Sequence, residues 1–308
     1  MRRAILLLAL LVTSVLAATM VRLPVSAVDA PSQSISLSPA LTELSINPGE
    51  TASRTLEVNN NGDLDFNITL SVAPYSVENI VYDPNFTLLP GATEVTSWVD
   101  LPSGATEVSS RGIYKAAYSI TVPAGTAPGG YYAVIFAETT PSGDEDAGGV
   151  VARNRVGNIL YITVKGTIET GGSVTDVPLN GFLMQDSVPL GVLVQNTGGT
   201  HFASTIKLNV DNIFGGRVFT SDLERFILPQ TERRVSVDWA PTSPVGIYKV
   251  YRSATINGEE KSLPVQTIIH IQPWFAGIIG IMFAIIVISV IIRVTVRRKK
   301  RAREAKED

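Results

Sequence analysis

Polar and apolar residues alternate along much of the chain between residues 34 and 272. Residues 66–72 (FNITLSV) put four apolar side chains on one face of an extended strand and three polar ones on the other. Residues 206–210 and 235–239 repeat this alternation. It is typical of antiparallel sheets with one buried and one solvated face. No long helical period interrupts this region, so we expect it to be all-β.

Two short motifs occur twice in the same order. V-x-N-x-G is found at 58–62 and 194–198, and P-x-G-x-Y-x-V at 128–134 and 244–250. Together with the many short strands separated by turn residues, this repeat predicts two tandem Ig-like β-sandwich domains, at 34–169 and 174–272.

The two copies of the repeat differ in length. The motifs start 70 residues apart in the first copy and 50 in the second. The first domain is therefore expected to carry an insertion of about 20 residues near 75–100. Gly171 and Gly172, between the domains, suggest some freedom of hinge motion.

The N-terminal residues have the layout of a secretory signal. Two arginines precede an uncharged apolar run from Ala4 to Ala18, and residues 25–27 (VSA) offer a small-x-small cleavage pattern. We expect residues 1–27 to be a signal peptide. An uncleaved N-terminal anchor is the alternative, and it places the following domains on the same extracytoplasmic side.

A second apolar segment lies near the other end of the chain. Residues 274–292 contain no charge, and as a helix they would span roughly 28 Å, close to the thickness of a bilayer core. Trp274 stands where an interfacial aromatic side chain is expected. We predict a single transmembrane helix, whose small residues at 276, 280 and 284 are compatible with self-association through helix pairing.

The residues after this helix, 293–308, are strongly basic. The positive-inside rule predicts that this tail lies in the cytoplasm, which makes the protein a type I single-pass protein of the cell membrane. The bases that set this topology are Arg293, Arg297, Arg298, Lys299, Lys300 and Arg301.

Composition excludes several classes of function. With both ends set aside, 14 basic and 25 acidic residues remain, so the ectodomain carries about −11 and is not expected to bind nucleic acid. The chain has no Cys and two His, which excludes disulfides, thiolate metal sites and Cys nucleophiles. We predict no cofactor and no metal site.

The search for catalytic chemistry gives little. His201 lies in a Gly-rich turn and His270 in an alternating strand, and neither has ligand-type neighbours in the sequence. No nucleophile elbow, zinc-protease or phosphate-loop motif is present. The acidic residues 144–146 are expected to form a solvated loop. The protein is therefore predicted not to be an enzyme.

The overall order of segments resembles the WxL-interacting protein family of Gram-positive bacterial surfaces. The matching stretches are 47–61, 122–136 and 148–164, whereas residues 75–111 depart from the usual family segment. The resemblance implies a cell-surface protein. Its first Ig-like domain would be associated with peptidoglycan and its second with a secreted partner.

Three functions compete at this point. The first is a non-catalytic adhesion protein that binds cell-wall polysaccharide or a secreted surface protein. Its candidate exposed ligand-binding residues are Tyr82 and Trp98 in the insertion, although lone aromatic residues more often lie in a core. The second is a membrane-tethered chaperone or assembly factor that binds a client through an unpaired strand edge in the first domain. A membrane-tethered enzyme is the third and the least favoured. We expect the first.

Overall fold

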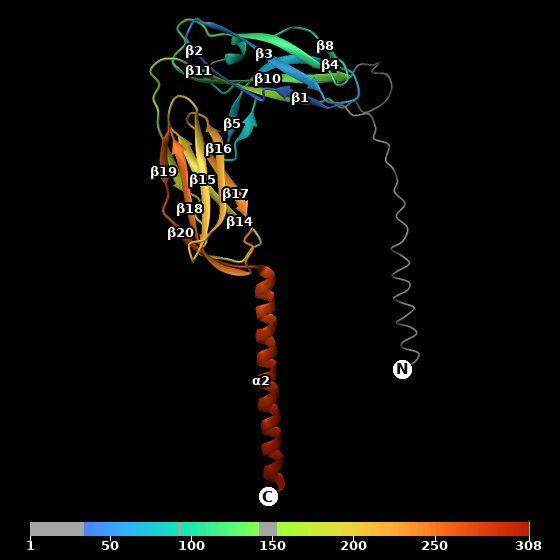
Figure 1. The fold of residues 1–308 in the computed structure, drawn as a ribbon, viewed down its shortest axis with the longest axis vertical. Helices are drawn as coiled ribbons and strands as arrows, with labels where there is room; N and C mark the ends of the chain where they lie inside the picture. The colour runs from blue at the N-terminus through green and yellow to red at the C-terminus, as the bar shows by residue number, and fades with distance from the viewer. Residues whose placement is uncertain (1–33, 92–93, 142–152, 308) are drawn as a thin grey trace, which may run out of the picture.

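A computed structural model describes residues 34–91, 94–141 and 153–307. They form two β-sandwiches in series, followed by one long helix (Figure 1). The all-β expectation for the two domains before the helix is confirmed. The predicted signal peptide, residues 1–27, and the acidic residues 144–146 lie outside the described residues.

The first domain packs two sheets against each other. Their strand orders are β1-β3-β9-β7 and β2-β11-β10-β4-β8, and all neighbours are antiparallel except β2 and β11. Alternate apolar residues of both sheets fill the space between them, and Leu56, Ile120, Ile135 and Leu160 are fully buried. The strands are β1 (Ile35–Ser38), β2 (Leu41–Ile46), β3 (Thr51–Asn60), β4 (Phe66–Pro74), β7 (Val99–Asp100), β8 (Thr106–Val108), β9 (Ile113–Thr121), β10 (Gly129–Pro141) and β11 (Arg155–Val164).

The region of the predicted insertion forms a small unit of its own. It contains the hairpin of β5 (Ser76–Glu78) and β6 (Asp83–Asn85), followed by a 3-10 turn, η1 (Val95–Trp98). The hairpin leaves the first sandwich and reaches toward the second domain (Figure 1).

The second domain has the same two-layer construction. A sheet of order β12-β14-β17 faces one of order β13-β20-β18-β15-β16, with β19 paired to β18. Its core includes the buried Arg252 on β18, which forms an ion pair with the partly exposed Asp176 on β12 and so links the two sheets. The strands are β12 (Gly172–Asp176), β13 (Phe182–Leu183), β14 (Val188–Asn196), β15 (Phe202–Asn212), β16 (Arg217–Ile227), β17 (Glu232–Trp239), β18 (Val245–Ile256), β19 (Glu259–Ser262) and β20 (Gln266–Ile271).

The repeated asparagine plays the same structural role in both domains. Asn60 accepts a hydrogen bond from the Gly62 N–H (3.0 Å) and donates to the carbonyls of Leu64 and Val108. Asn196 accepts from the N–H of residue 198 and donates to the carbonyls of residues 200 and 227. Each buried side chain thus holds a turn and ties it to a neighbouring strand.

The repeated tyrosine of the P-x-G-x-Y-x-V motif also has the same packing in both domains. A Cβ added to Gly130 would lie 2.2 Å from the Tyr132 hydroxyl, and one added to Gly246 would lie 2.5 Å from the Tyr248 ring. In each domain the tyrosine therefore folds back over the glycine two residues earlier. The G-x-Y spacing is a packing requirement, which explains why it recurs.

The last element, α2 (Pro273–Glu307), begins two residues after β20 ends. Residues Pro273–Thr295 have a mean hydropathy of 3.0 and are long and apolar enough to cross a membrane. None of this segment is buried against the two described domains. The second domain lies next to the helix and the first lies farthest from it (Figure 1).

Candidate functional site

Strand β9 has an open edge. It pairs with β3 along its whole length, from Ile113 to Thr121. On its other side, β7 pairs only with Ser119 and Ile120. Residues 113–118 therefore have no strand partner on that side within the described part of the chain.

The backbone groups at this edge can be assigned to one side or the other. The Asn60 N–H donates to the Gly112 carbonyl (2.9 Å), and the Val122 N–H donates to the Glu50 carbonyl (3.0 Å). Because direction alternates along an antiparallel strand, even-numbered residues of β9 turn their N–H and C=O groups toward β3. Ile113, Lys115 and Ala117 turn theirs toward the open edge.

The side chains along this edge offer little protection against pairing. Lys115 is the only charged residue of β9, and its Nζ lies 2.8 Å from Glu57 on β3. Ile113 is 59% exposed and Ala117 is small. By contrast, the outer strand β16 carries Asp222, Glu224 and Arg225 among other charges, which is how sheet edges are usually blocked.

A hollow of about 370 Å³ lies where β7 stops and the open edge starts. It is lined by Ser53, Asp100, Leu101, Pro102, Ala117, Tyr118 and Ser119.

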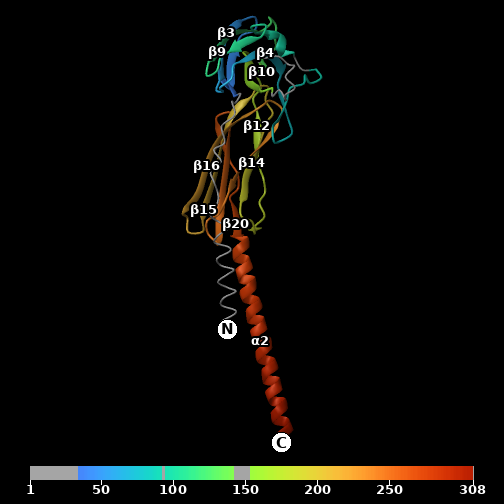
Figure 2. The same ribbon diagram turned by 90° about the vertical axis from the view of Figure 1, so that its right-hand side faces the viewer.

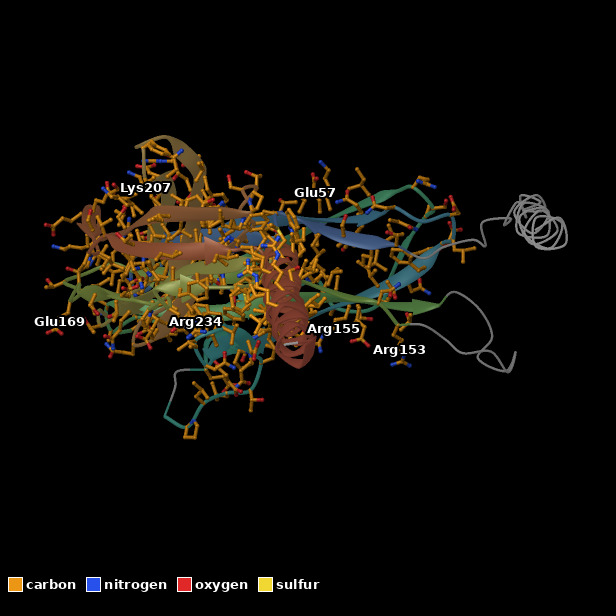
Figure 3. The ribbon with its side chains drawn as sticks, turned by 90° about the horizontal axis from the view of Figure 1, so that it is seen from below. Glu57, Arg153, Arg155, Glu169, Lys207 and Arg234 are labelled. Carbon is orange, nitrogen blue, oxygen red and sulfur yellow. The ribbon has the colours of Figure 1, made fainter. Side chains whose placement is uncertain are left out.

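The open edge belongs to the sheet of β3 and β9, which lies on the opposite side of the first domain from β4 and β10 (Figure 2). In the view from below, Glu57 lies on the side of β3 and Arg155 on the side of β10 and β11 (Figure 3).

The two aromatic residues that the sequence singled out lie elsewhere. Trp98 is 5% exposed, and its ring centroid lies 4.8 Å from that of Tyr131 in the core of the first domain. Trp98 therefore has the core position that lone aromatic residues more often take, because η1 turns the side chain inward, and it lacks the exposure that ligand binding would need. Tyr82 is half-buried at the junction between the domains, so the two residues do not form an exposed pair.

The insertion hairpin fastens the two domains together. The Tyr82 hydroxyl accepts a hydrogen bond from the Leu228 N–H (2.8 Å) and contacts the Thr231 hydroxyl. The Arg233 guanidinium lies 4.3 Å from the centroid of the Tyr82 ring, a cation–π contact. The Arg234 N–H donates to the carbonyl of residue 80 (2.7 Å).

His201 forms a second set of junction contacts. Its Nε2 lies 3.1 Å from Glu43, and its Nδ1 lies 3.0 Å from the Tyr132 hydroxyl. The ring packs against Tyr161 and Phe226 at centroid distances of 4.7 and 5.8 Å. Burial lowers the pKa of His201, while the hydrogen bond to Glu43 raises it by less. Burial disfavours the charged form of a tyrosine, so it raises the pKa of Tyr132 and of Tyr161 well above the ordinary value.

The second histidine, His270, contacts the backbone of its own domain. His270 is fully buried, with Nε2 2.6 Å from the carbonyl of residue 185. The described residues contain no group of three or more His, Asp or Glu placed to hold a metal ion.

The residues predicted to set the membrane topology all lie on α2. Trp274 is 54% exposed and donates from Nε1 to Gln272 (2.9 Å). Arg293 and Arg297 are exposed. The helix continues through residues 298–301, which include the remaining predicted bases Arg298, Lys299, Lys300 and Arg301.

No family model and no curated protein matches the chain. Among solved structures, the class 5 fimbriae chaperone CfaA is similar, with 9% identity and a TM-score of 0.40 over 76% of this chain and 99% of that one. The Acinetobacter baumannii CsuC–CsuE chaperone–adhesion subunit complex gives 10% identity and a TM-score of 0.38 over 78% and 99%. A PapD-like domain of human CEP192 gives 19% and 0.32 over 48% and 96%. Likeness at these identities concerns the fold alone.

Proposed function

We propose that the chain is a non-catalytic, membrane-anchored protein whose first domain holds a protein client by strand addition at β9. The observation that supports this most directly is the unpaired stretch from Ile113 to Tyr118, with one charge that is already paired. Strand addition gains affinity from main-chain hydrogen bonds and specificity from pockets for alternate side chains. The hollow beside Ala117 could receive such a side chain.

A secreted surface protein fits this edge better than a cell-wall glycan. The edge presents amide and carbonyl groups at every second residue, a pattern that matches an extended polypeptide. The aromatic residues expected to stack on a sugar, Tyr82 and Trp98, are committed to the domain junction and to the core. The resemblance to WxL-interacting proteins remains a prediction, and it agrees with a secreted protein partner.

Anchoring through α2 completes the proposal. Its uncharged run is followed by basic residues, which favours an extracytoplasmic ectodomain and a cytoplasmic C-terminus. Because the chain has no cysteine, single cysteines at Ser103 and Ala305 can be labelled selectively. A membrane-impermeant maleimide applied to intact cells should label position 103 alone. Labelling of position 305 instead would show that the C-terminus lies outside the cell and that the topology is the reverse of the proposed one.

Two variants at one position test the edge. Ala117→Pro removes the outward N–H but leaves the ladder from residues 116 and 118 to β3 in place. Ala117→Thr keeps this N–H and adds a residue that favours strands. Full-length protein in detergent would be mixed with the secreted proteins of its host, and the retained proteins quantified by mass spectrometry.

A client held by strand addition should be retained by the original protein and by Ala117→Thr but lost with Ala117→Pro. With that client purified, amide hydrogen exchange should slow at Ile113, Lys115 and Ala117. Equal retention by both variants, or binding that leaves these three amides unprotected, would show that β9 is not the binding edge.

A further inference from the structure

Exposed apolar residues form a row across the second domain at the end that faces α2. Ile269 on β20 is paired with Phe182 on β13 and with Ile247 on β18. Residues directly opposite on neighbouring strands share one face of a sheet. These three side chains are 42%, 55% and 38% exposed, so the row lies on the solvent face.

Neighbouring residues extend the row. Val245 lies two residues before Ile247, on the same face, and is 50% exposed. The turn from β15 to β16 adds Ile213 and Phe214, at 52% and 94% exposed. This turn directly follows Asn212, which pairs with Tyr248, so it lies level with Ile247 or beyond it. We call Phe182, Ile213, Phe214, Val245, Ile247 and Ile269 the basal apolar surface.

The basal apolar surface is a local feature of this domain. Val265, just before β20, is the one large exposed apolar residue of the described second domain that lies away from this end. A cavity of about 420 Å³ opens between the β15–β16 turn and the loop before β18, and Phe214, Val218, Trp239 and Tyr248 are among its lining residues. Continuous exposed apolar area of this kind marks a contact surface.

The start of α2 is fixed at the same end. Val245 pairs with Ile271, the last residue of β20. The Gln272 N–H donates to the Pro244 carbonyl (2.8 Å), and its side-chain amide donates to the Pro241 carbonyl (2.6 Å). The helix leaves the domain beside the lower ends of β15 and β20 in both side views (Figures 1 and 2).

The length of α2 sets the height of this end above a membrane. The first charge after Pro273 is Arg293, so the uncharged run is about 30 Å long at about 1.5 Å per residue. This length equals the hydrocarbon thickness of about 30 Å and leaves none to spare. With Arg293 at the far edge of the hydrocarbon core, a spanning α2 therefore places Ile271 at the bilayer surface.

We propose that the basal apolar surface inserts into the interfacial layer of the leaflet that α2 enters and forms a second attachment of the ectodomain to the same membrane. This inference rests on the proposed membrane anchor. Apolar side chains that lie in the interface are buried among headgroups and upper acyl chains, which Phe214 at the tip of a turn can reach. The continuity of the surface with the start of α2 identifies lipid as its occupant.

Single cysteines in the Cys-free chain test this directly. The full chain is placed in lipid nanodiscs with an environment-sensitive NBD label at position 214, 265 or 284, and with lipids that carry a spin-label quencher. Labels at 214 and at the mid-helix position 284 should show blue-shifted emission and quenching by lipid. The label at Val265, an exposed apolar residue of the same domain, should show neither.

The outcomes separate the inference from the anchor. Quenching at 284 without quenching at 214 would overturn the inference and leave the anchor intact, whereas no quenching at 284 would overturn both. Iodide in the buffer quenches a label that water can reach. If the label at 214 is shielded from iodide in discs with several copies of the chain but not in discs with one copy, the occupant is a second copy, and the inference is overturned.

A further pair of samples excludes insertion driven by the label itself. A label at Ile247→Cys should be quenched by lipid when Phe214 is present, and this quenching should be lost in Phe214→Ser. Unchanged quenching in Phe214→Ser would show that Phe214 does not hold the surface in the membrane.

Discussion

Nε2 of His201 lies 3.1 Å from Oε1 of Glu43 and joins a turn of the second domain to strand β2 of the first. The side chain of His201 is 6% exposed, and Nδ1 faces the Tyr132 hydroxyl, which also accepts a hydrogen bond from the His201 N–H (3.0 Å). A neutral imidazole satisfies all these contacts, because it donates a hydrogen bond from Nε2 to Glu43 and accepts one at Nδ1 from the Tyr132 hydroxyl. Protonation of Nδ1 removes that acceptor.

The junction should therefore weaken in mild acid. The pKa of His201 is lowered in the folded protein, so the unfolded chain binds this proton first as the pH falls below the ordinary value of 6.5. The free energy of unfolding should decrease through that range and be restored above it. Denaturant unfolding of the full chain in detergent at several pH values measures how the free energy of unfolding changes with pH. His201→Phe keeps a ring against Tyr161 and should make this change smaller. An equal change in the variant would mean that other groups cause the pH dependence.

Tyr82→Phe should loosen the domain junction without changing either sandwich. The substitution leaves the ring beneath Arg233 but removes the acceptor for the Leu228 N–H, at a cost of about 1–3 kcal/mol. Amide hydrogen exchange at Leu228 should become faster. Tyr114→Phe in the first domain is the control and should change stability by less than about 0.5 kcal/mol. Equal effects of the two changes would contradict the role of the Tyr82 hydroxyl.

Adjacent asparagines should differ sharply in their effect on stability. Asn60 is 2% exposed, and its side chain bonds to four backbone groups, among them the Gly62 N–H and the Val108 carbonyl. Asn60→Ala should lower the free energy of unfolding by about 2–4 kcal/mol, because buried backbone groups lose their partners. Asn61 is exposed, and Asn61→Ala should cost less than about 1 kcal/mol. Denaturant unfolding compares them, and similar losses would refute the local role of the repeat.

Trp98→Ala should destabilise the first domain by about 3–5 kcal/mol, as expected when a large buried aromatic side chain is removed. Its ring contacts Tyr131, so near-ultraviolet circular dichroism should lose signal as well. A loss of stability below about 1 kcal/mol would mean that the side chain is exposed in solution, as a ligand-binding role would require.

Local patterns predicted the parts of this fold that depend on short-range geometry. Alternation predicted the strands, because the side-chain period of a strand is fixed. The V-x-N-x-G and G-x-Y motifs predicted two related domains, because each motif builds its contacts within a few residues of itself. The difference in motif spacing predicted the size of an insertion in the first domain, whereas its position near 75–100 stays a prediction.

The contacts between the domains could not be predicted in this way. Tyr82 meets Thr231 across 149 residues, and no period in the sequence relates the two positions. Trp98 follows polar neighbours and looks exposed until η1 turns it inward. Gly171 and Gly172 suggested hinge motion, yet a Cβ at these positions would lie 2.6 Å from Thr197 and 2.5 Å from the Gln195 carbonyl. Glycine in a linker indicates close approach as readily as freedom.

The direct step from β20 to α2 has a mechanical consequence. Tension between a client on the first domain and the membrane would enter the second sandwich through β12 and leave it through β20, along the direction of the strands. The hydrogen bonds along the six paired positions of β20 and β18 would then be loaded in shear, all at once rather than one after another. A pull on the client should therefore tilt or displace α2 before the second sandwich unfolds, so that the two domains transmit the force to α2 while they stay folded.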